Sequence, residues 1–210
     1  MEDVLDVSTR PLDPNHPQVC FDESSKQHIQ EVRTPLPTAP GEPMRYDTEY
    51  ERNGVSNLFM FFCPLLNWRH VKVTDRRTAG DWAQCMREVV DVHFPDAERI
   101  SVVVDTLTTH LPGSLSVAFE PAEAKRIWDK LEFHSTPKHG SWLTMAEIEL
   151  SVLSRQCLDR RIPNQERLAA EVAAWEEERN VSGAPVNWRF TTADARIKLK
   201  HLYPSLETIK

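Results

Sequence analysis

Apolar and polar positions along the chain divide it into short strand-like runs and longer helix-like repeats. Runs of apolar residues or strict alternation, both typical of strands, occupy five segments: 19–21, 58–62, 69–75, 99–104 and 131–136. Apolar residues recur at helical spacing in five further segments, which begin near Thr78, Pro121, Ser141, Asn164 and Thr191. The second and third strands follow each other closely, so we expect them to form a hairpin.

Two stretches before the second strand contain strong turn signals. Residues 34–43 include four prolines, which fix φ and lack an amide donor, so we expect a long loop between strands. Asn53 and Gly54 form a pair typical of turns, and the next strand is expected to begin after them. Residues 1–18 are polar and contain prolines, which favours a flexible lead-in.

The order of these elements predicts an α/β fold. A strand and a two-stranded hairpin are followed by alternating helices and strands, which indicates a mixed sheet of about five strands with flanking helices and further helices at the C-terminus. This is the element order of the ribonuclease H-like fold. We therefore predict a lead-in over 1–18, a main domain over 19–160, and a C-terminal helical extension over 161–210 that packs on the same domain.

Composition and charge limit the class of protein. The 210 residues are 40% hydrophobic and 27% charged, as in globular proteins, and no apolar run is long enough to span a membrane. Four scattered cysteines without a CxxC pair argue against a structural zinc site and favour a reducing, cytoplasmic location. The net charge of −7 argues against a dedicated DNA-binding module, although short basic clusters occur.

Three acidic residues could form a metal site. Asp22 follows the first apolar run, and Asp105 follows the strand over 99–104, at the edge where open α/β sheets bind ligands. Glu147 lies in the helix that begins near Ser141, but Glu149 is two residues away and about 200° around that helix. Only one of these glutamates can face the aspartates. Such a set can hold two Mg²⁺ ions, roughly 3.5–4 Å apart, for displacement at phosphorus.

Several segments around these residues resemble one family of enzymes. The segments are 19–23, 52–54, 68–71, 104–110 and 136–150. Together they are similar to the bacterial insertion-sequence transposases of the mariner-related group, which have a DDE endonuclease domain. The resemblance runs from about residue 19 to the C-terminal region, and its part over 141–150 is far more specific than an acidic triad.

The resemblance implies a function and a set of site residues. Asp22, Asp105 and Glu147 would be the catalytic, metal-binding carboxylates of a DDE domain over 19–160, with two Mg²⁺ or Mn²⁺ ions as cofactors. The expected activity is cleavage of DNA at the element ends and strand transfer into a target. The candidates for DNA contacts are Lys138, His139 and His110.

The resemblance also implies partners. Family members carry helix-turn-helix domains before the first strand, whereas only 18 residues precede Val19, so a catalytic half with a separately encoded or missing DNA-binding half is expected. A homodimer is expected, in which the loop over 34–56 reaches the second subunit. Thr106 and Thr144 stand where the family usually has Asn, which would change the hydrogen bonding beside the metals.

Two other functions fit parts of the sequence. A decayed or repurposed transposase remnant could act as a regulatory or dimerisation partner, and the two threonines and the short front segment favour it. Decay would not, however, spare three carboxylates in particular. A cellular ribonuclease H-like nuclease acting on RNA–DNA hybrids fits the fold but does not explain the segment over 141–150.

Overall fold

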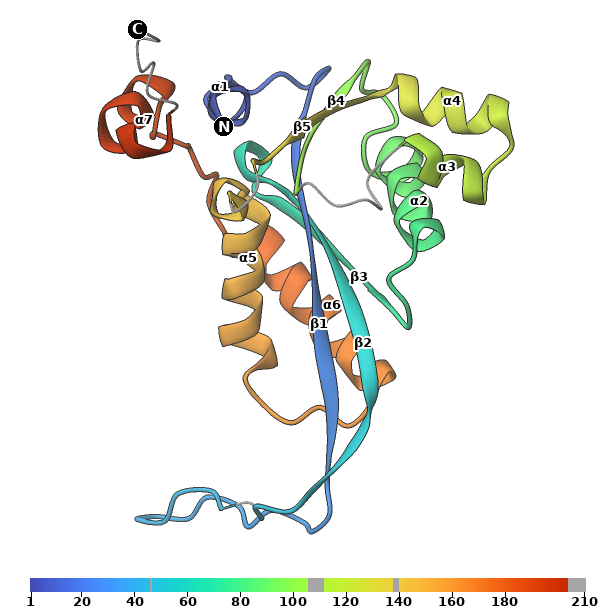
Figure 1. The fold of residues 1–210 in the computed structure, drawn as a ribbon. Helices are drawn as coiled ribbons and strands as arrows, with labels where there is room; N and C mark the ends of the chain where they lie inside the picture. Colours follow the sequence, from blue (N-terminus) through green and yellow to red (C-terminus); the bar gives the residue numbers. More distant parts are fainter. Residues whose placement is uncertain (46, 106–111, 138–139, 204–210) are drawn as a thin grey trace, which may run out of the picture.

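The strands predicted from the apolar pattern form one mixed sheet (Figure 1). The structure is a computed structural model, and it describes residues 1–45, 47–105, 112–137 and 140–203. The strands are β1 (Gln18–Glu31), β2 (Tyr50–Cys63), β3 (Trp68–Thr74), β4 (Ile100–Val104) and β5 (Leu131–Ser135). Their order across the sheet is β3-β2-β1-β4-β5; β2 is antiparallel to β1 and β3, whereas β1, β4 and β5 are parallel.

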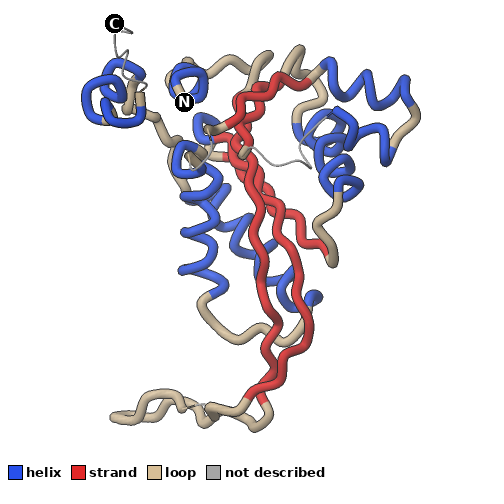
Figure 2. Tube along the Cα trace, in the orientation of Figure 1, coloured by secondary structure: helices blue, strands red, loops and turns tan. Residues whose placement is uncertain are grey.

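Helices cover both faces of this sheet (Figure 2). The helices are α1 (Glu2–Ser8), α2 (Ala79–Glu88), α3 (Pro112–Ala118), α4 (Pro121–Asp129), α5 (Met145–Leu153), α6 (Gln165–Ser182) and α7 (Thr192–Lys198). Apolar residues of α2, α3 and α4 share one core with the sheet, and those of α1, α5, α6 and α7 share a second core. The prediction of a mixed α/β sheet with flanking helices is confirmed, and it is consistent with the ribonuclease H-like fold.

Alternation along β1 separates these two cores. Val19 and Phe21 lie in the core with α2, whereas Cys20, between them, lies in the core with α5. Successive side chains of a strand point to opposite faces, so this division is what a doubly covered strand requires. The face of the sheet that carries Cys20 therefore also carries the next even-numbered residue, Asp22.

Side-chain caps start the helices close to the predicted points. Thr78 with Asp81, and Thr191 with Asp194, form capping boxes at α2 and α7. Asn164 accepts a hydrogen bond from the amide of Arg167 and caps α6. The helix expected from Ser141 begins later, because residues 141–143 form a 3₁₀ turn and α5 starts at Met145.

The structure corrects two predictions about the first two strands. β1 does not stop at Asp22 but continues to Glu31, paired with β2 along its length. Asn53 and Gly54 are not a turn between strands. They lie inside β2, opposite His28, where the pairing with β1 shifts, and Gly54 has φ +93°. This is the geometry of a β-bulge. The proline-rich segment does connect the strands as a loop, as predicted.

The expectation of a flexible lead-in over 1–18 does not describe its first residues. These form α1, in which Val4, Leu5 and Val7 are completely buried in the core with α5. The chain then reaches β1, which begins at Gln18. Across the described residues, the helices are too short or too polar to cross a membrane.

Candidate metal and catalytic site

Asp22 and Asp105 are brought together by two neighbouring strands. The parallel pairing of β1 with β4 places Cys20 opposite Val103, and each aspartate is two residues beyond its member of this pair. Side chains two residues apart in an extended chain share a face. Cys20 and Val103 both lie in the core with α5. The register therefore directs both carboxylates toward the side of the sheet that α5 covers.

Asp105 is oriented by the strand on its other side. The Thr136 hydroxyl donates a hydrogen bond to Asp105 Oδ1 at 3.1 Å, and the Thr136 amide donates to the carbonyl of Val104 at 2.9 Å. Thr136 follows β5 directly and is buried. This contact was not predicted, although the register Val104↔Ser135 makes it the expected neighbour once β4 and β5 are paired.

Glu147 belongs to the first turn of α5. The Thr144 hydroxyl accepts a hydrogen bond from the amide of Ala146 at 3.4 Å and caps this helix. Leu143, Met145 and Ala146 are buried in the core that α5 shares with β1 and β2. Glu147 itself is exposed. The start of the helix is therefore anchored on the sheet, and its glutamate is turned to the surface.

The pKa of Asp22 depends on its burial and on the charges of the other two carboxylates. Burial raises the pKa of Asp22 to about 6, while the amide of Glu23, which donates to Asp22 Oδ1 at 2.8 Å, acts in the opposite direction. The negative charges of Glu147 and Asp105 raise the pKa of Asp22 further. Both Glu147 and Asp105 therefore act on Asp22 by disfavouring its charged form.

The chemistry of this donor set suits a divalent cation. Carboxylate oxygens are the ligands that Mg²⁺ and Mn²⁺ prefer, and a cation would offset the cost of burying the Asp22 charge. Among the described residues, however, no three His, Cys, Asp or Glu side chains are placed so that they could hold one metal ion. Binding at these carboxylates therefore requires their side chains to move closer together.

The structure separates the two glutamates of α5. Glu149 is 4% exposed, and its carboxylate pairs with Arg69 at 2.7 Å and with Arg179 at 3.2 Å. The carboxylate of Glu149 is therefore ion-paired with both arginines in the core between α5, β3 and α6. Glu147, on a different side of the helix, is the glutamate that acts on Asp22. This supports the choice of Glu147 over Glu149 without using the family resemblance.

Some predicted site residues lie outside the described part of the chain. These are Thr106, His110, Lys138 and His139. Thr144, the other departure from the family pattern, is described and serves as the cap of α5.

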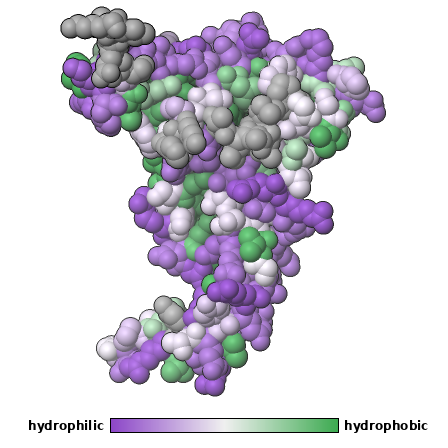
Figure 3. All heavy atoms as spheres, viewed as in Figure 1, coloured by the Kyte–Doolittle hydropathy of each residue, from purple (hydrophilic) through white to green (hydrophobic). Residues whose placement is uncertain are grey.

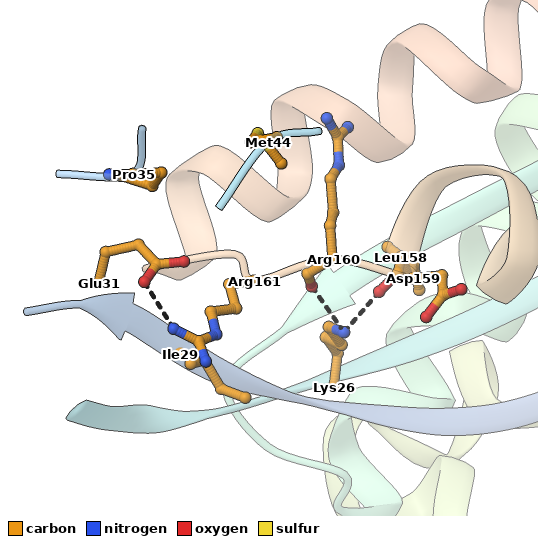
Figure 4. A pocket seen from close by; sticks show the side chains of 9 residues that line it. All are labelled: Lys26, Ile29, Glu31, Pro35, Met44, Leu158, Asp159, Arg160 and Arg161. Carbon is orange, nitrogen blue, oxygen red and sulfur yellow. Dashed lines mark hydrogen bonds and ion pairs between the residues drawn. The ribbon is translucent and has the colours of Figure 1, made fainter. Parts of the chain in front are cut away.

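A cavity of about 690 Å³ lies elsewhere, toward the far end of β1 (Figure 4). Its lining includes Lys26, Ile29 and Glu31 of β1, from four to nine residues beyond Asp22. Lys26 Nζ donates to the carbonyls of Leu158 and Arg160 at 2.6 and 3.2 Å. At about 3.3 Å per residue along a strand, this cavity is separate from the carboxylates.

Comparisons with known proteins agree with this fold. A family model described as DDE superfamily endonuclease matches residues 17–169. Among solved structures, the Mos1 mariner paired-end complex with Mn has a TM-score of 0.51 and 14% identity, covering 77% of this chain and 48% of that chain. The Mos1 paired-end complex with left transposon end has a TM-score of 0.53 and 13% identity, covering 81% of this chain and 49% of that chain. No curated protein matches the sequence.

A chain of the simian T-cell lymphotropic virus intasome in complex with PP2A regulatory subunit B56 gamma is also similar, with a TM-score of 0.52 and 11% identity, covering 96% of this chain and 59% of that chain. Likenesses at such low identity establish a shared fold. The chain spans about half the length of the Mos1 chains that it matches. The family match, in contrast, covers well over half of this sequence and includes all three carboxylates. The chain therefore belongs to the DDE superfamily of endonucleases.

Proposed function

We propose that this chain is the catalytic domain of a mariner-related DDE transposase, which cleaves DNA at the ends of an insertion sequence and transfers the strand into a target. Membership of the endonuclease family and the fold shared with Mos1 transposase support this activity. The observation that carries it is the β1–β4 register, which directs Asp22 and Asp105 to the side of the sheet that α5 covers, together with the negative charges of Glu147 and Asp105 that raise the pKa of Asp22.

In this proposal, Asp22, Asp105 and Glu147 hold two Mg²⁺ or Mn²⁺ ions, which supply charge and Lewis acidity for in-line displacement at phosphorus. The residues of the chain prepare the site. A carboxyl group must be deprotonated to act as a ligand. Burial raises the pKa of Asp22 to about 6, so below about that pH Asp22 must first lose a proton. The Thr136 hydroxyl holds the carboxylate of Asp105 in orientation. Lys138, His139 and His110 remain proposed contacts for DNA phosphates.

The proposed partners are DNA, a second copy of the chain and a helix-turn-helix half encoded separately. The similar Mos1 structures are a strand transfer complex and a paired-end complex with a transposon end, which supports DNA as the substrate. Apolar side chains are also exposed along the extended β1–β2 ribbon and its loop, where Figure 3 shows them scattered among polar residues. The exposed ones are Val32, Leu36, Met44, Tyr50 and Val55. We assign this ribbon to the contact with the second subunit.

We place the reaction in the cytoplasm. All four cysteines, Cys20, Cys63, Cys85 and Cys157, are unpaired and buried, which suits a reducing compartment. Burial also raises the pKa of the Cys20 and Cys85 thiols to about 12, so neither is a reactive thiolate near neutral pH.

Nicking of supercoiled plasmid in the presence of Mn²⁺ tests the proposed activity. Asp105→Asn and Glu147→Gln are each expected to lower the rate by more than about 100-fold, beyond the range typical of changes outside the ligand shell. The matched control is Glu166→Gln, because Glu166 is also an exposed glutamate in the first turn of a helix, α6. Its nicking rate should equal that of the unaltered chain.

Two results would contradict the proposal. Nicking at the same rate by the unaltered chain and by both site variants would mean that these carboxylates do no catalysis. Absence of nicking by the unaltered chain, together with absence of Mn²⁺ binding in calorimetry, would instead favour a non-catalytic remnant.

A further inference from the structure

A buried ion pair connects the helix of Glu147 to the sheet. Arg69 of β3 is 1% exposed, and its Nε lies 2.7 Å from Glu149 Oε1 on α5. Arg179 of α6 adds a second cation, with Nη2 at 3.2 Å from the same oxygen. Three elements that are far apart in sequence therefore meet at one carboxylate.

The guanidinium of Arg69 is fixed from several sides. Its Nη1 donates to Asn180 Oδ1 at 3.1 Å, and its Nη2 donates to Asn67 Oδ1 at 3.0 Å. Asn180 also accepts from the amide of Arg69 at 2.8 Å and donates to its carbonyl at 2.9 Å. The guanidinium carbon lies 5.3 Å from the centre of the Phe62 ring. Arg69 is thus a rigid reference point between β3 and α6.

Hydrophobic burial alone does not determine how α5 is rotated about its axis. Apolar residues occur around most of this helix, and Ile148 remains 50% exposed. Consecutive residues are 100° apart, so a rotation of that size would exchange Glu149 for Ile148 at the inward position. At that position an apolar side chain would take the place of a carboxylate. The observed rotation buries a charged glutamate instead, which the cation of Arg69 makes possible.

The rotation of α5 decides where Glu147 points. Glu149 is two residues from Glu147, about 200° around the helix. With Glu149 held against Arg69, Glu147 is turned to the surface near Asp22. We propose that Arg69 and Glu149, assisted by Arg179, are positioning residues that aim Glu147 at the metal site. This inference rests on the proposed role of Glu147 as a metal ligand.

The test is to replace the ion pair by neutral side chains of similar size, in Arg69→Met/Glu149→Met. Removal of both charges leaves no unpaired charge at position 69, and Arg179, which loses its partner, is 30% exposed to water, so the double variant is expected to fold. The expected result is binding of Mn²⁺, measured by calorimetry, that is about 10- to 100-fold weaker. The rate of plasmid nicking at saturating DNA should fall by a similar factor, with KM for DNA unchanged.

Two controls separate positioning from stability. Glu176→Gln loosens the contact between the same two elements, β3 and α6, because Glu176 accepts from the amide of Val71 at 2.8 Å and pairs with His70. It leaves the Arg69–Glu149 pair intact, so Mn²⁺ affinity should not change even if the melting temperature falls. Should the double variant fail to fold, Arg69→Lys decides, since it keeps a cation at this position but loses the guanidinium contacts with Asn67 and Asn180 that fix the ion pair. Weaker Mn²⁺ binding by Arg69→Lys supports positioning, and unchanged binding overturns it.

The outcomes also distinguish this inference from the proposed function. A folded double variant that binds Mn²⁺ and nicks DNA like the unaltered chain would overturn the positioning role, provided that Glu147→Gln loses both properties. If Glu147→Gln itself binds Mn²⁺ normally, the assignment of Glu147 as a ligand is wrong, and the positioning proposal falls with it.

Discussion

Asp22 is a partly buried acid whose charge is unfavourable unless a cation is near. Its pKa of about 6 lies well above the ordinary 3.8, first because of burial and then because Glu147 and Asp105 add negative charge. A strong shift of this kind in a structural ion pair would be downward, toward the charged form. The upward shift is what repulsion between acids in one region produces. Under the proposed function, Asp22 is therefore the carboxylate that would gain most from a bound divalent cation.

This shift predicts how metal binding depends on pH. The pKa of Asp22 is raised, so below about pH 6 the folded chain holds a proton that must leave when Mn²⁺ binds. Apparent affinity should therefore rise by up to roughly tenfold per pH unit toward pH 6 and level off above it. Calorimetry between pH 5 and pH 8 measures this. Asp22→Asn should remove the step, and equal affinity of the unaltered chain at pH 5 and pH 7 would contradict the assignment.

Local patterns supplied the candidate carboxylates of the proposed site but not the contacts that orient them. Asp105 was found because a strongly apolar strand precedes it. The sequence pattern left Glu147 and Glu149 equivalent as ligands, and only the family resemblance separated them. In the structure, Glu149 is distinguished by Arg69, 80 positions earlier in the chain, at 2.7 Å. Thr136 is likewise tied to Asp105 only through the pairing of β4 with β5. Neither contact has a local signal.

At the scale of elements, the predictions failed where pairing between strands decides the structure. The Asn53-Gly54 pair fits a turn and a bulge equally well, because both use a residue with positive φ. The partner strand resolves this, since β1 continues past Asp22 and keeps β2 paired on both sides of His28. The helix starts near Thr78 and Thr191 were predicted correctly, because the capping contacts of each helix lie within four residues.

The bulge makes Gly54 a position with a conformational requirement. Its φ of +93° is unfavourable for residues with a side chain, although a Cβ would meet only His28 Cδ2, at 4.0 Å. Gly54→Ala should therefore lower the free energy of unfolding by about 1–2 kcal/mol through backbone strain, measured by urea denaturation. Gly80→Ala in α2 is the matched control, because its Cβ meets Thr78 Oγ1 at a comfortable 3.6 Å. It should be neutral or stabilising, and equal losses from both would exclude strain as the cause.

At the scale of the whole molecule, the two ends of the described chain meet. Asp6 Oδ1 accepts a hydrogen bond from the Thr192 hydroxyl of α7 at 2.5 Å, and Arg196 pairs with Glu2 at 2.7 Å (Figure 1). Asp3 also pairs with the buried His134 of β5 at 2.9 Å. These contacts place α1 over the second core. The seven residues of α1 are too few to show a helical period, which is why the sequence pattern indicated only a polar lead-in.

The core beneath α1 can be tested through Leu5, which is completely buried there. Leu5→Ala is expected to lower the free energy of unfolding by about 2–5 kcal/mol, since it removes apolar contacts and leaves a cavity. In a chain of this size, that corresponds to a fall in melting temperature of roughly 5–15 °C, measured by calorimetry. Leu12→Ala, in the exposed segment that follows α1, should change it little, because Leu12 is 46% exposed. If the two variants melt alike, α1 does not belong to the core. If only Leu5→Ala is destabilised, the first residues of the chain help to stabilise the core between the sheet and α5, the helix that carries Glu147.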